Sequence, residues 1–200
     1  MSKTLCSVLI PTRNRPAMLD RCLQSVFGTC GDPDQIEALL YVDDDDETTM
    51  AHWLKLRHWG RVKAMRGPRL GFARNSQVFD ALAAKALGKW VWLLNDDVVI
   101  TGEAWDEKLQ EIQTKRWIVG VERSHMHGSI QRNGVEQAFP IIPNGCWKQF
   151  APLGMPEPAD RGIHAMLTGR GWCWRWLQGI TCWHDINEDT TRQEHAWRPS

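Results

Sequence analysis

The sequence predicts an α/β domain whose central sheet is mainly parallel and flanked by helices. Short apolar runs alternate with helical patterns over roughly the first 120 residues, which is typical of strands joined by crossover helices. The run WVWLL at residues 90–94 is apolar at every position, as in a strand covered on both faces. A chain of 200 residues suffices for one such domain with an ample core. We therefore expect a single α/β domain with residues 90–94 near the middle of its sheet.

The charge balance does not favour a nucleic-acid or membrane protein. Lys and Arg together number 24, as do Asp and Glu, so the sequence indicates no basic surface for nucleic acid. No run reaches the roughly 20 apolar residues of a membrane span. The N-terminus MSKTLCSVLIPT lacks the long apolar core and cleavage site of a signal peptide. We expect a cytoplasmic protein without a membrane span.

The Cys and Trp residues are both interpreted first as core residues. The six Cys form no CxxC pair and several lie in apolar runs, so we expect reduced core side chains and no zinc site. The 12 Trp, against a single Tyr, also favour core packing. Trp can stack on sugar rings or bases as well, so two roles stay open for Trp172, Trp174, Trp176 and Trp183.

Strands and helices alternate along the first half of the chain. Residues 5–10 form an apolar run that ends at Pro11, as a first buried strand would. Asn14 and Pro16 suit the cap and first turn of a helix that continues to Phe27. Further strands are expected at residues 37–42, 61–65, 90–94 and 117–121, and further helices at 48–59 and 73–87.

The pattern loosens toward the second half. Thr101 is expected to cap a helix that carries on its inner face Trp105, Leu109 and Ile112. Residues 138–145 contain prolines, which predicts an irregular or edge strand. A short helix is expected at residues 161–167 and a strand at residues 172–176, and the tail from residue 181 is polar.

Asp96 and Asp97 interrupt an apolar stretch directly after the expected central strand. Two adjacent carboxylates cannot both be buried without compensation, because desolvating an unpaired carboxylate costs several kcal/mol. In an open α/β sheet, ligands bind at the carboxyl ends of central strands. A divalent ion that carries a phosphate would supply the missing positive charge. The alternative is a surface turn that contains Asp-Asp by chance.

A second acidic segment, residues 43–46, follows the strand expected at residues 37–42. Four consecutive Asp repel one another, and such a run is usually a solvated loop. Because this run also lies just beyond the carboxyl end of a strand, a ligand-binding role stays open.

Four segments together resemble the successive blocks of glycosyltransferase family two. They are residues 7–26 (SVLIPTRNRPAMLDRCLQSV), 42–44 (VDD), 71–82 (GFARNSQVFDAL) and 92–97 (WLLNDD). The resemblance implies a GT-A-like fold with a nucleotide-sugar-binding half at residues 1–122 and a small, irregular acceptor-side region at residues 123–200. The nucleotide-binding residues that it implies are Pro11, Thr12, Asn14, Asp43, Asp44 and Arg74, the last approaching the diphosphate. It places the metal, Mn²⁺ or Mg²⁺, on Asp97 with Asp96.

The resemblance also suggests a base and a third metal ligand. Asp160 precedes the helix expected at residues 161–167 and corresponds to the base that takes the acceptor's proton, with Glu157 in reserve. Asp160 could equally cap that helix. His184, after a late strand, is the candidate third ligand, and Asp185 is a possible substitute. A lone His is more often structural.

Two departures from the family pattern matter. Asn95 occupies the position of the first carboxylate of the usual DXD motif, which shifts the metal to Asp97. The QxxRW signature of processive synthases is absent, so polymer extrusion is not expected.

The predicted function is a metal-dependent glycosyltransferase that moves a sugar from a nucleotide donor to a carbohydrate or other hydroxyl acceptor. A UDP-linked donor and inversion at the sugar are favoured. The first alternative is a nucleotide-sugar-binding or carbohydrate-binding protein of the same fold that has lost catalysis. A nucleotidyltransferase would require a Gly-rich phosphate loop where this chain has PTRNR, and a metal phosphodiesterase a tighter cluster of His and Asp.

Overall fold

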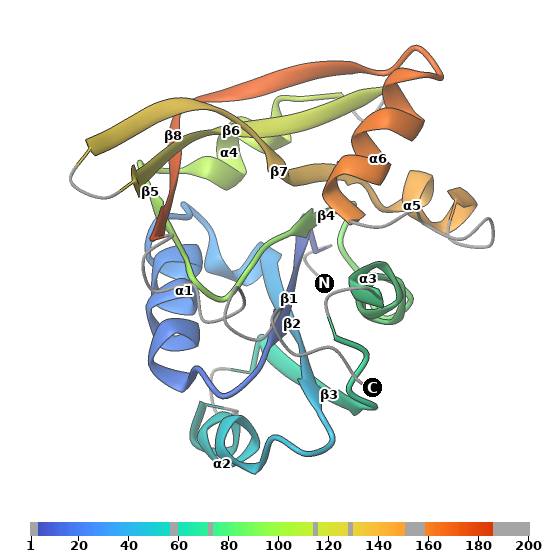
Figure 1. The fold of residues 1–200 in the computed structure, drawn as a ribbon. Coiled ribbons are helices and arrows are strands. Elements are labelled where there is room, and N and C mark those ends of the chain that lie inside the picture. The colour runs from blue at the N-terminus through green and yellow to red at the C-terminus, as the bar shows by residue number, and fades with distance from the viewer. Residues whose placement is uncertain are drawn as a thin grey trace.

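The computed structural model describes residues 4–56, 60–71, 74–113, 116–127, 130–150 and 159–185. These residues form one eight-stranded sheet in the order β3-β2-β1-β4-β7-β6-β8-β5. Helices cover it on both sides, and the long strands β6, β7 and β8 arch over one end (Figure 1). Within the described residues, no helix is both long and apolar enough to cross a bilayer.

The parallel part of the sheet comes from the first half of the chain, as expected. Its strands are β1 (Cys6–Thr12), β2 (Ile36–Asp43), β3 (Val62–Gly67) and β4 (Trp90–Leu93). β1 pairs in parallel with β2 on one side and with β4 on the other. Because all four run in the same direction, their carboxyl ends share one edge of the sheet.

The rest of the sheet is mostly antiparallel, and the position of one of its strands differs from the one expected from the sequence. β7 (Ile130–Pro143) lies between β4 and β6 (Trp117–His127), so the strand expected at residues 138–145 is not an edge strand, but it is irregular, because the register of its pairing with β6 shifts there. Pro140 falls where the pairing of β6 with β7 jumps in register, so its missing N–H costs little there. Pro143 is the last paired residue of β7.

The last two strands bring a late part of the chain back to the parallel part. β8 (Cys173–Asp185) runs parallel to β6, and its end pairs antiparallel with β5 (Val98–Thr101). In this pairing His184 lies opposite Val98, the residue after Asp97. Cys173, at the start of β8, is exposed, so the expectation that every Cys lies in the core was wrong for this residue.

Helices divide between the two faces of the sheet. One face carries α1 (Pro16–Gly28), α2 (Glu47–Leu56) and α4 (Trp105–Gln110), and the other carries α3 (Asn75–Ala83), α5 (Asn144–Phe150) and α6 (Ala159–Thr168) (Figure 1). A short 3-10 turn, η1 (Pro33–Gln35), leads into β2. Each face has its own cluster of buried apolar side chains, which confirms a sheet covered on both sides.

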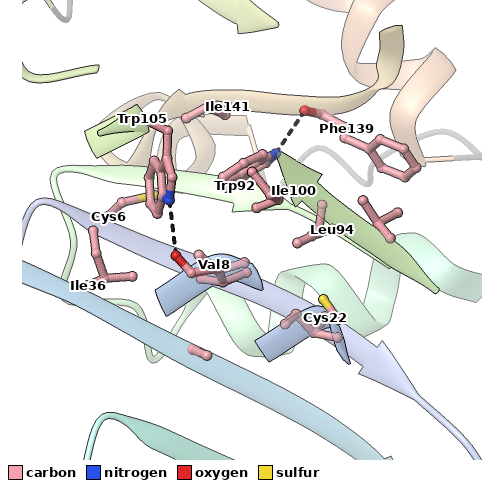
Figure 2. Packing of buried hydrophobic residues seen from close by; sticks show 14 of the residues in the cluster. Cys6, Val8, Cys22, Ile36, Trp92, Leu94, Ile100, Trp105, Phe139 and Ile141 are labelled. Carbon is pink, nitrogen blue, oxygen red and sulfur yellow. Dashed lines mark hydrogen bonds between the residues drawn. The ribbon is translucent and has the colours of Figure 1, made fainter. Parts of the chain in front are cut away.

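Buried tryptophans fill the core around β4. The rings of Trp92 and Trp105 meet edge to face, with centroids 5.0 Å apart (Figure 2). Each indole N–H donates to a backbone carbonyl, that of Trp92 to Phe139 at 3.1 Å and that of Trp105 to Val26 at 3.0 Å. Satisfying these donors removes the penalty of burying them.

Several helix boundaries differ from the expected ones, and the N-cap of α1 is Arg15 and not Asn14. Thr101 does not cap a helix but ends β5, where it pairs with Thr181, and α4 begins only at Trp105. α3 ends at Ala83 instead of continuing to residue 87. The N–H groups that follow have other acceptors, since that of Leu87 donates to Glu37 and that of Gly88 to the Ser7 hydroxyl.

Candidate functional site

The two acidic segments predicted from the sequence both lie at the carboxyl edge of the parallel strands. Asp43 is the last residue of β2 and residues 44–46 follow it, whereas the turn with Asp96 and Asp97 follows β4. Between these two strands lies β1, whose last residue is Thr12. The loop from β1 to α1, residues 13–15, therefore reaches both acidic segments.

Asp96 is fully buried and is held by that loop. Its Oδ2 accepts a hydrogen bond from the Thr12 hydroxyl at 2.7 Å and one from Arg15 Nε at 3.2 Å. Its Oδ1 lies 2.5 Å from Arg15 Nη2. Burial raises the pKa of Asp96 to about 7, although Arg15 and Thr12 favour the ionised form. A protein cation therefore supplies the positive charge that the sequence demanded here.

Asp97 is half-buried as a residue, but its side chain is only 5% exposed. Its Oδ2 lies 3.4 Å from Arg15 Nη1 and 3.4 Å from His184 Nε2. Burial tends to raise the pKa of Asp97, but contact with His184 and the charge of Arg15 outweigh it and hold the pKa below its usual value. Its other oxygen, Oδ1, has no hydrogen-bond partner among the described residues.

His184 reaches Asp97 because of strand pairing. Its position opposite Val98 places it beside the acidic turn, and its ring packs edge-on against Phe139, with centroids 5.8 Å apart. Both ring nitrogens are buried and neither forms a hydrogen bond of good geometry within the described part of the chain. Buried polar atoms without partners are rare and call for an explanation, such as an ion.

The fit to a divalent cation can be judged from these atoms. Asp97 Oδ1 is a carboxylate donor of the kind that Mn²⁺ and Mg²⁺ prefer, and the His184 ring adds an imidazole nitrogen, a donor better matched to later transition metals than to Mg²⁺. Both oxygens of Asp96 lie against Arg15, although Oδ1, 2.5 Å from Nη2, has no hydrogen bond of good geometry. No group of three or more His, Cys, Asp or Glu suited to a metal is found among the residues that the structure describes. Asp97 and His184 thus fit as a partial ligand set, which other oxygen ligands would have to complete.

In the first acidic segment, Asp43 and Asp45 share one arginine. Arg13 Nη1 donates to Asp43 Oδ2 at 2.9 Å, and both terminal nitrogens of Arg13 bind the Asp45 carboxylate. Burial raises the pKa of Asp43 in spite of Arg13. The hydrogen bonds from Arg13 lower the pKa of the exposed Asp45.

The other two carboxylates of this segment differ in role. Asp46 is buried and caps α2, because its side chain accepts the N–H of Thr49 at 2.9 Å and that of Asn14 at 2.8 Å. Asp44 is exposed, and only its backbone is fixed, its N–H donating to Gly67 O at 2.8 Å. Its carboxylate forms no hydrogen bond with the described residues and is available to a ligand.

The sequence assignments missed Arg13 and Arg15. Asn14 between them has a left-handed backbone with φ 52°, which Asn tolerates better than most residues. Arg13 binds the segment after β2, whereas Arg15 binds the turn after β4. The signal that could have identified them is the placement of two Arg at alternate positions of one loop. The chain has two acidic segments at strand ends, and each Arg could pair with one of them.

Arg74 and Pro11 are placed without direct contact to the acidic turn. Arg74 precedes α3 and is exposed, and its side chain forms no hydrogen bond or ion pair within the described residues. Pro11 is half-buried in β1 and pairs with Tyr41 of β2.

The predicted base is located only by its backbone. Asp160 is the second residue of α6 and so lies inside its first turn instead of capping it. Its side chain and the reserve candidate Glu157 lie outside the described residues, as does the side chain of Asp185 at the end of β8. These three assignments stay predictions.

Comparison with known families gives one match for the sequence. Residues 7–143 match the model of the family described as Glycosyl transferase family 2. A comparison with curated proteins finds no match.

Solved structures resemble the fold closely at low sequence identity. A complex of *S. aureus* TarS 1–349 with UDP-GlcNAc gives a TM-score of 0.71 at 14% identity, covering 92% of this chain and 59% of that chain. The mannosyltransferase PcManGT from *Pyrobaculum calidifontis*, in complex with GDP-Man and Mn²⁺, gives 0.69 at 12% identity, covering 98% of this chain and 63% of that chain. GalNAc-T7 with UDP, GalNAc and Mn²⁺ gives 0.67 at 14% identity, covering 91% and 43%. The chain thus spans less than two thirds of the length of each.

Proposed function

The chain belongs to glycosyl transferase family 2 and has the GT-A fold, as predicted, and from this premise we propose that it moves a sugar from a nucleoside-diphosphate donor to a hydroxyl acceptor. The observation that carries the proposal is the pairing of Asp97 with His184 at the carboxyl edge of the parallel strands. Both side chains are largely buried there and keep polar atoms without partners.

The chemistry of transfer explains why such a site is required. Breaking the bond between the sugar and the diphosphate builds positive charge on the ring and negative charge on the leaving group. Mn²⁺ or Mg²⁺, when bound by Asp97 and His184, would neutralise that negative charge. Asp96 is proposed to belong to the same site through its contact with Arg15. Mn²⁺ is the ion named with two of the similar structures, which favours it over Mg²⁺.

The nucleotide is proposed to lie along the ends of β1 and β2. The exposed carboxylate of Asp44 is suited to accept hydrogen bonds from a base or ribose, with Asp43 beside it. Pro11, Thr12 and Asn14 would form the wall of this region, because they end β1 and begin the loop to α1. Arg74 is proposed to contact the diphosphate, and its exposed side chain is available for that role.

The donor is proposed to be a UDP-sugar. TarS is described with UDP-GlcNAc and GalNAc-T7 with UDP, whereas PcManGT is described with GDP-Man. Residues 1–122 would bind the donor and residues 123–200 the acceptor, although this boundary falls inside β6. A cytoplasmic location stays a prediction.

The test is binding and turnover measured on the same preparation. We expect UDP to bind in calorimetric titrations with Mn²⁺ and to bind much more weakly with EDTA. Incubation with UDP-sugars should release UDP, and acceptor arrays should show transfer. Binding without turnover on any donor or acceptor would instead indicate a nucleotide-sugar-binding protein that has lost catalysis.

A substitution at Asp160 tests whether this residue is the base that takes the acceptor's proton in an inverting mechanism. Asp160→Asn should leave UDP binding unchanged and lower the transfer rate by about 10²–10⁴-fold, the usual contribution of general base catalysis. Glu157→Gln is the matched control and should retain transfer. Full activity in Asp160→Asn would remove the assignment.

A further inference from the structure

Arg15 lies at the carboxyl edge of the parallel strands, and the proposed sugar transfer gives this residue no role. Its guanidinium lies against both oxygens of Asp96, with 2.5 Å from Nη2 to Oδ1 and 3.2 Å from Nε to Oδ2. Its Nη1 also lies 3.4 Å from Asp97 Oδ2. Two carboxylates and one guanidinium leave a single net negative charge at the turn.

The two carboxylates are engaged to different extents. Asp96 has each oxygen in contact with Arg15, and Oδ2 accepts from Thr12 as well, although Oδ1, 2.5 Å from Arg15 Nη2, has no hydrogen bond of good geometry. Asp97 keeps Oδ1 without a partner although its side chain is only 5% exposed, and His184 Nε2 lies 3.4 Å from its Oδ2. Adjacent residues of one turn therefore face different partners, Asp96 the loop after β1 and Asp97 the end of β8.

We propose that Arg15 is a positioning residue that keeps Asp96 as its counter-ion and thereby leaves Asp97 and His184 to face a divalent cation. This inference rests on the proposed function, because the cation concerned is the one that accompanies the donor. Arg15 repels a cation bound at Asp97, and the single remaining negative charge attracts it only weakly. The free protein therefore binds Mn²⁺ weakly, and the diphosphate of the donor supplies the negative charge and the oxygen ligands that are missing.

The chain offers a matched control for the test. Arg13 lies in the same loop and forms comparable ion pairs, but it binds Asp43 and Asp45 instead of the turn after β4. Arg13→Gln and Arg15→Gln change the net charge equally. A difference between them therefore reports position and not overall charge.

The measurement is Mn²⁺ affinity, read from the electron paramagnetic resonance signal of free Mn²⁺ at pH 8, with and without UDP. In the wild type, UDP should tighten Mn²⁺ binding strongly. Arg15→Gln should tighten Mn²⁺ binding to the free protein about tenfold or more, because the repelling charge is removed and Asp96 is released. It should also reduce the further gain from UDP. Arg13→Gln should leave Mn²⁺ affinity unchanged.

A folded Arg15→Gln variant with unchanged or weaker Mn²⁺ affinity would overturn the inference. If that variant does not fold by circular dichroism, the double variant Arg15→Gln/Asp96→Asn carries the test, since it removes both members of the buried pair. Its Mn²⁺ affinity in the UDP complex should stay within about threefold of the wild type, because an ion without contact to Asp96 loses no ligand. A loss of more than about tenfold would identify Asp96 as a ligand and contradict the inference.

The inference and the proposed function can fail separately. If wild-type protein binds UDP with Mn²⁺ but Arg15→Gln does not change the affinity of the free protein, only the role of Arg15 is wrong. If the wild type binds neither UDP nor a UDP-sugar with Mn²⁺ present, the proposed function itself is wrong.

Discussion

Two acidic segments at the same sheet edge are neutralised by one loop, yet their environments differ. Arg13 binds Asp43 and Asp45 after β2, and Arg15 binds Asp96 and Asp97 after β4. The Asp45 side chain is 54% exposed, whereas that of Asp96 is completely buried. Water can therefore replace Arg13 at Asp45, whereas Asp96 is closed to water and depends on Arg15.

This difference separates structural neutralisation from a candidate binding site. Exposed ion pairs contribute little, because water and salt screen them. Breaking a buried pair is costly because it leaves a desolvated charge. Among the described residues, the buried carboxylate oxygens of the two segments that lack a hydrogen bond are Oδ1 of Asp96 and Oδ1 of Asp97, and both ring nitrogens of the neighbouring His184 lack one as well. Acidic residues in the sequence are thus weak indicators of a metal site until their burial is known.

The largest expected effect is a difference between the two acidic segments in their contribution to Mn²⁺-dependent UDP binding. Asp97→Ala should abolish the dependence of UDP binding on Mn²⁺, because it removes the carboxylate with the free oxygen. Calorimetric titration of UDP with and without Mn²⁺ measures this. The control, Asp45→Ala, should keep Mn²⁺-dependent UDP affinity within about threefold, since its carboxylate faces water. Equal effects of the two variants would remove the distinction.

The next effect concerns stability. Arg15→Gln should lower the free energy of unfolding by about 3 kcal/mol, because it leaves the buried Asp96 without its cation. Urea denaturation at pH 8 measures the change. Restoring neutrality in Arg15→Gln/Asp96→Asn should recover a large part of that loss. If Arg15→Gln alone is as stable as the wild type, the Arg15–Asp96 pair contributes little to the free energy of unfolding.

Asp96 and Asp45, one from each segment, should also respond to pH with opposite sign. The pKa of Asp96 is about 7 in the folded protein against an ordinary value of 3.8, so between these values the folded state binds more protons than the unfolded state. The free energy of unfolding should therefore fall as pH rises from about 4 to about 7, with a slope of up to about 1.4 kcal/mol per pH unit. Asp96→Asn should remove this slope in urea denaturation at several pH values.

For Asp45 the sign is reversed. Arg13 lowers the pKa of Asp45, so its contribution to stability is present above the ordinary value of 3.8 and is lost as pH falls below it. Asp45→Asn should therefore change the pH dependence only in the acid range. A slope between pH 4 and 7 that survives in Asp96→Asn would contradict the assignment to Asp96.

The parallel half of the fold was predictable because its strands are continuous apolar runs. Residues 90–94 read as a strand covered on both faces, and β4 is such a strand. The hairpin of β6 and β7 was not predicted, since residues 124–136 show little periodicity and Pro140 suggested an edge. Where a register jump accommodates a proline, the sequence alone gives no sign of it.

The candidate site was also predicted only in part, because some of its contacts depend on the tertiary structure. A strand end with two carboxylates required a cation, for which the residues suggested a divalent ion, and the family resemblance placed Mn²⁺ or Mg²⁺ on these carboxylates. The resemblance also suggested His184, which the pairing of β5 with β8 brings to Asp97. The nearest cation, Arg15, comes from a different loop, and its direction depends on the left-handed backbone at Asn14. Such a contact is set by tertiary structure and not by spacing.

The smallest expected effect is at the exposed segment. Arg13→Gln should lower the thermal midpoint by no more than about 3 °C, because water solvates Asp45 once the arginine is gone. Differential scanning calorimetry at low salt and at 0.5 M salt measures this, and the difference from wild type should shrink further at high salt. A decrease comparable to that of Arg15→Gln would mean that burial does not set the strength of these pairs. The contrast between the two arginines would then have to arise from the half-buried Asp43, which Asp43→Asn in the Arg13→Gln background would reveal by restoring the lost stability.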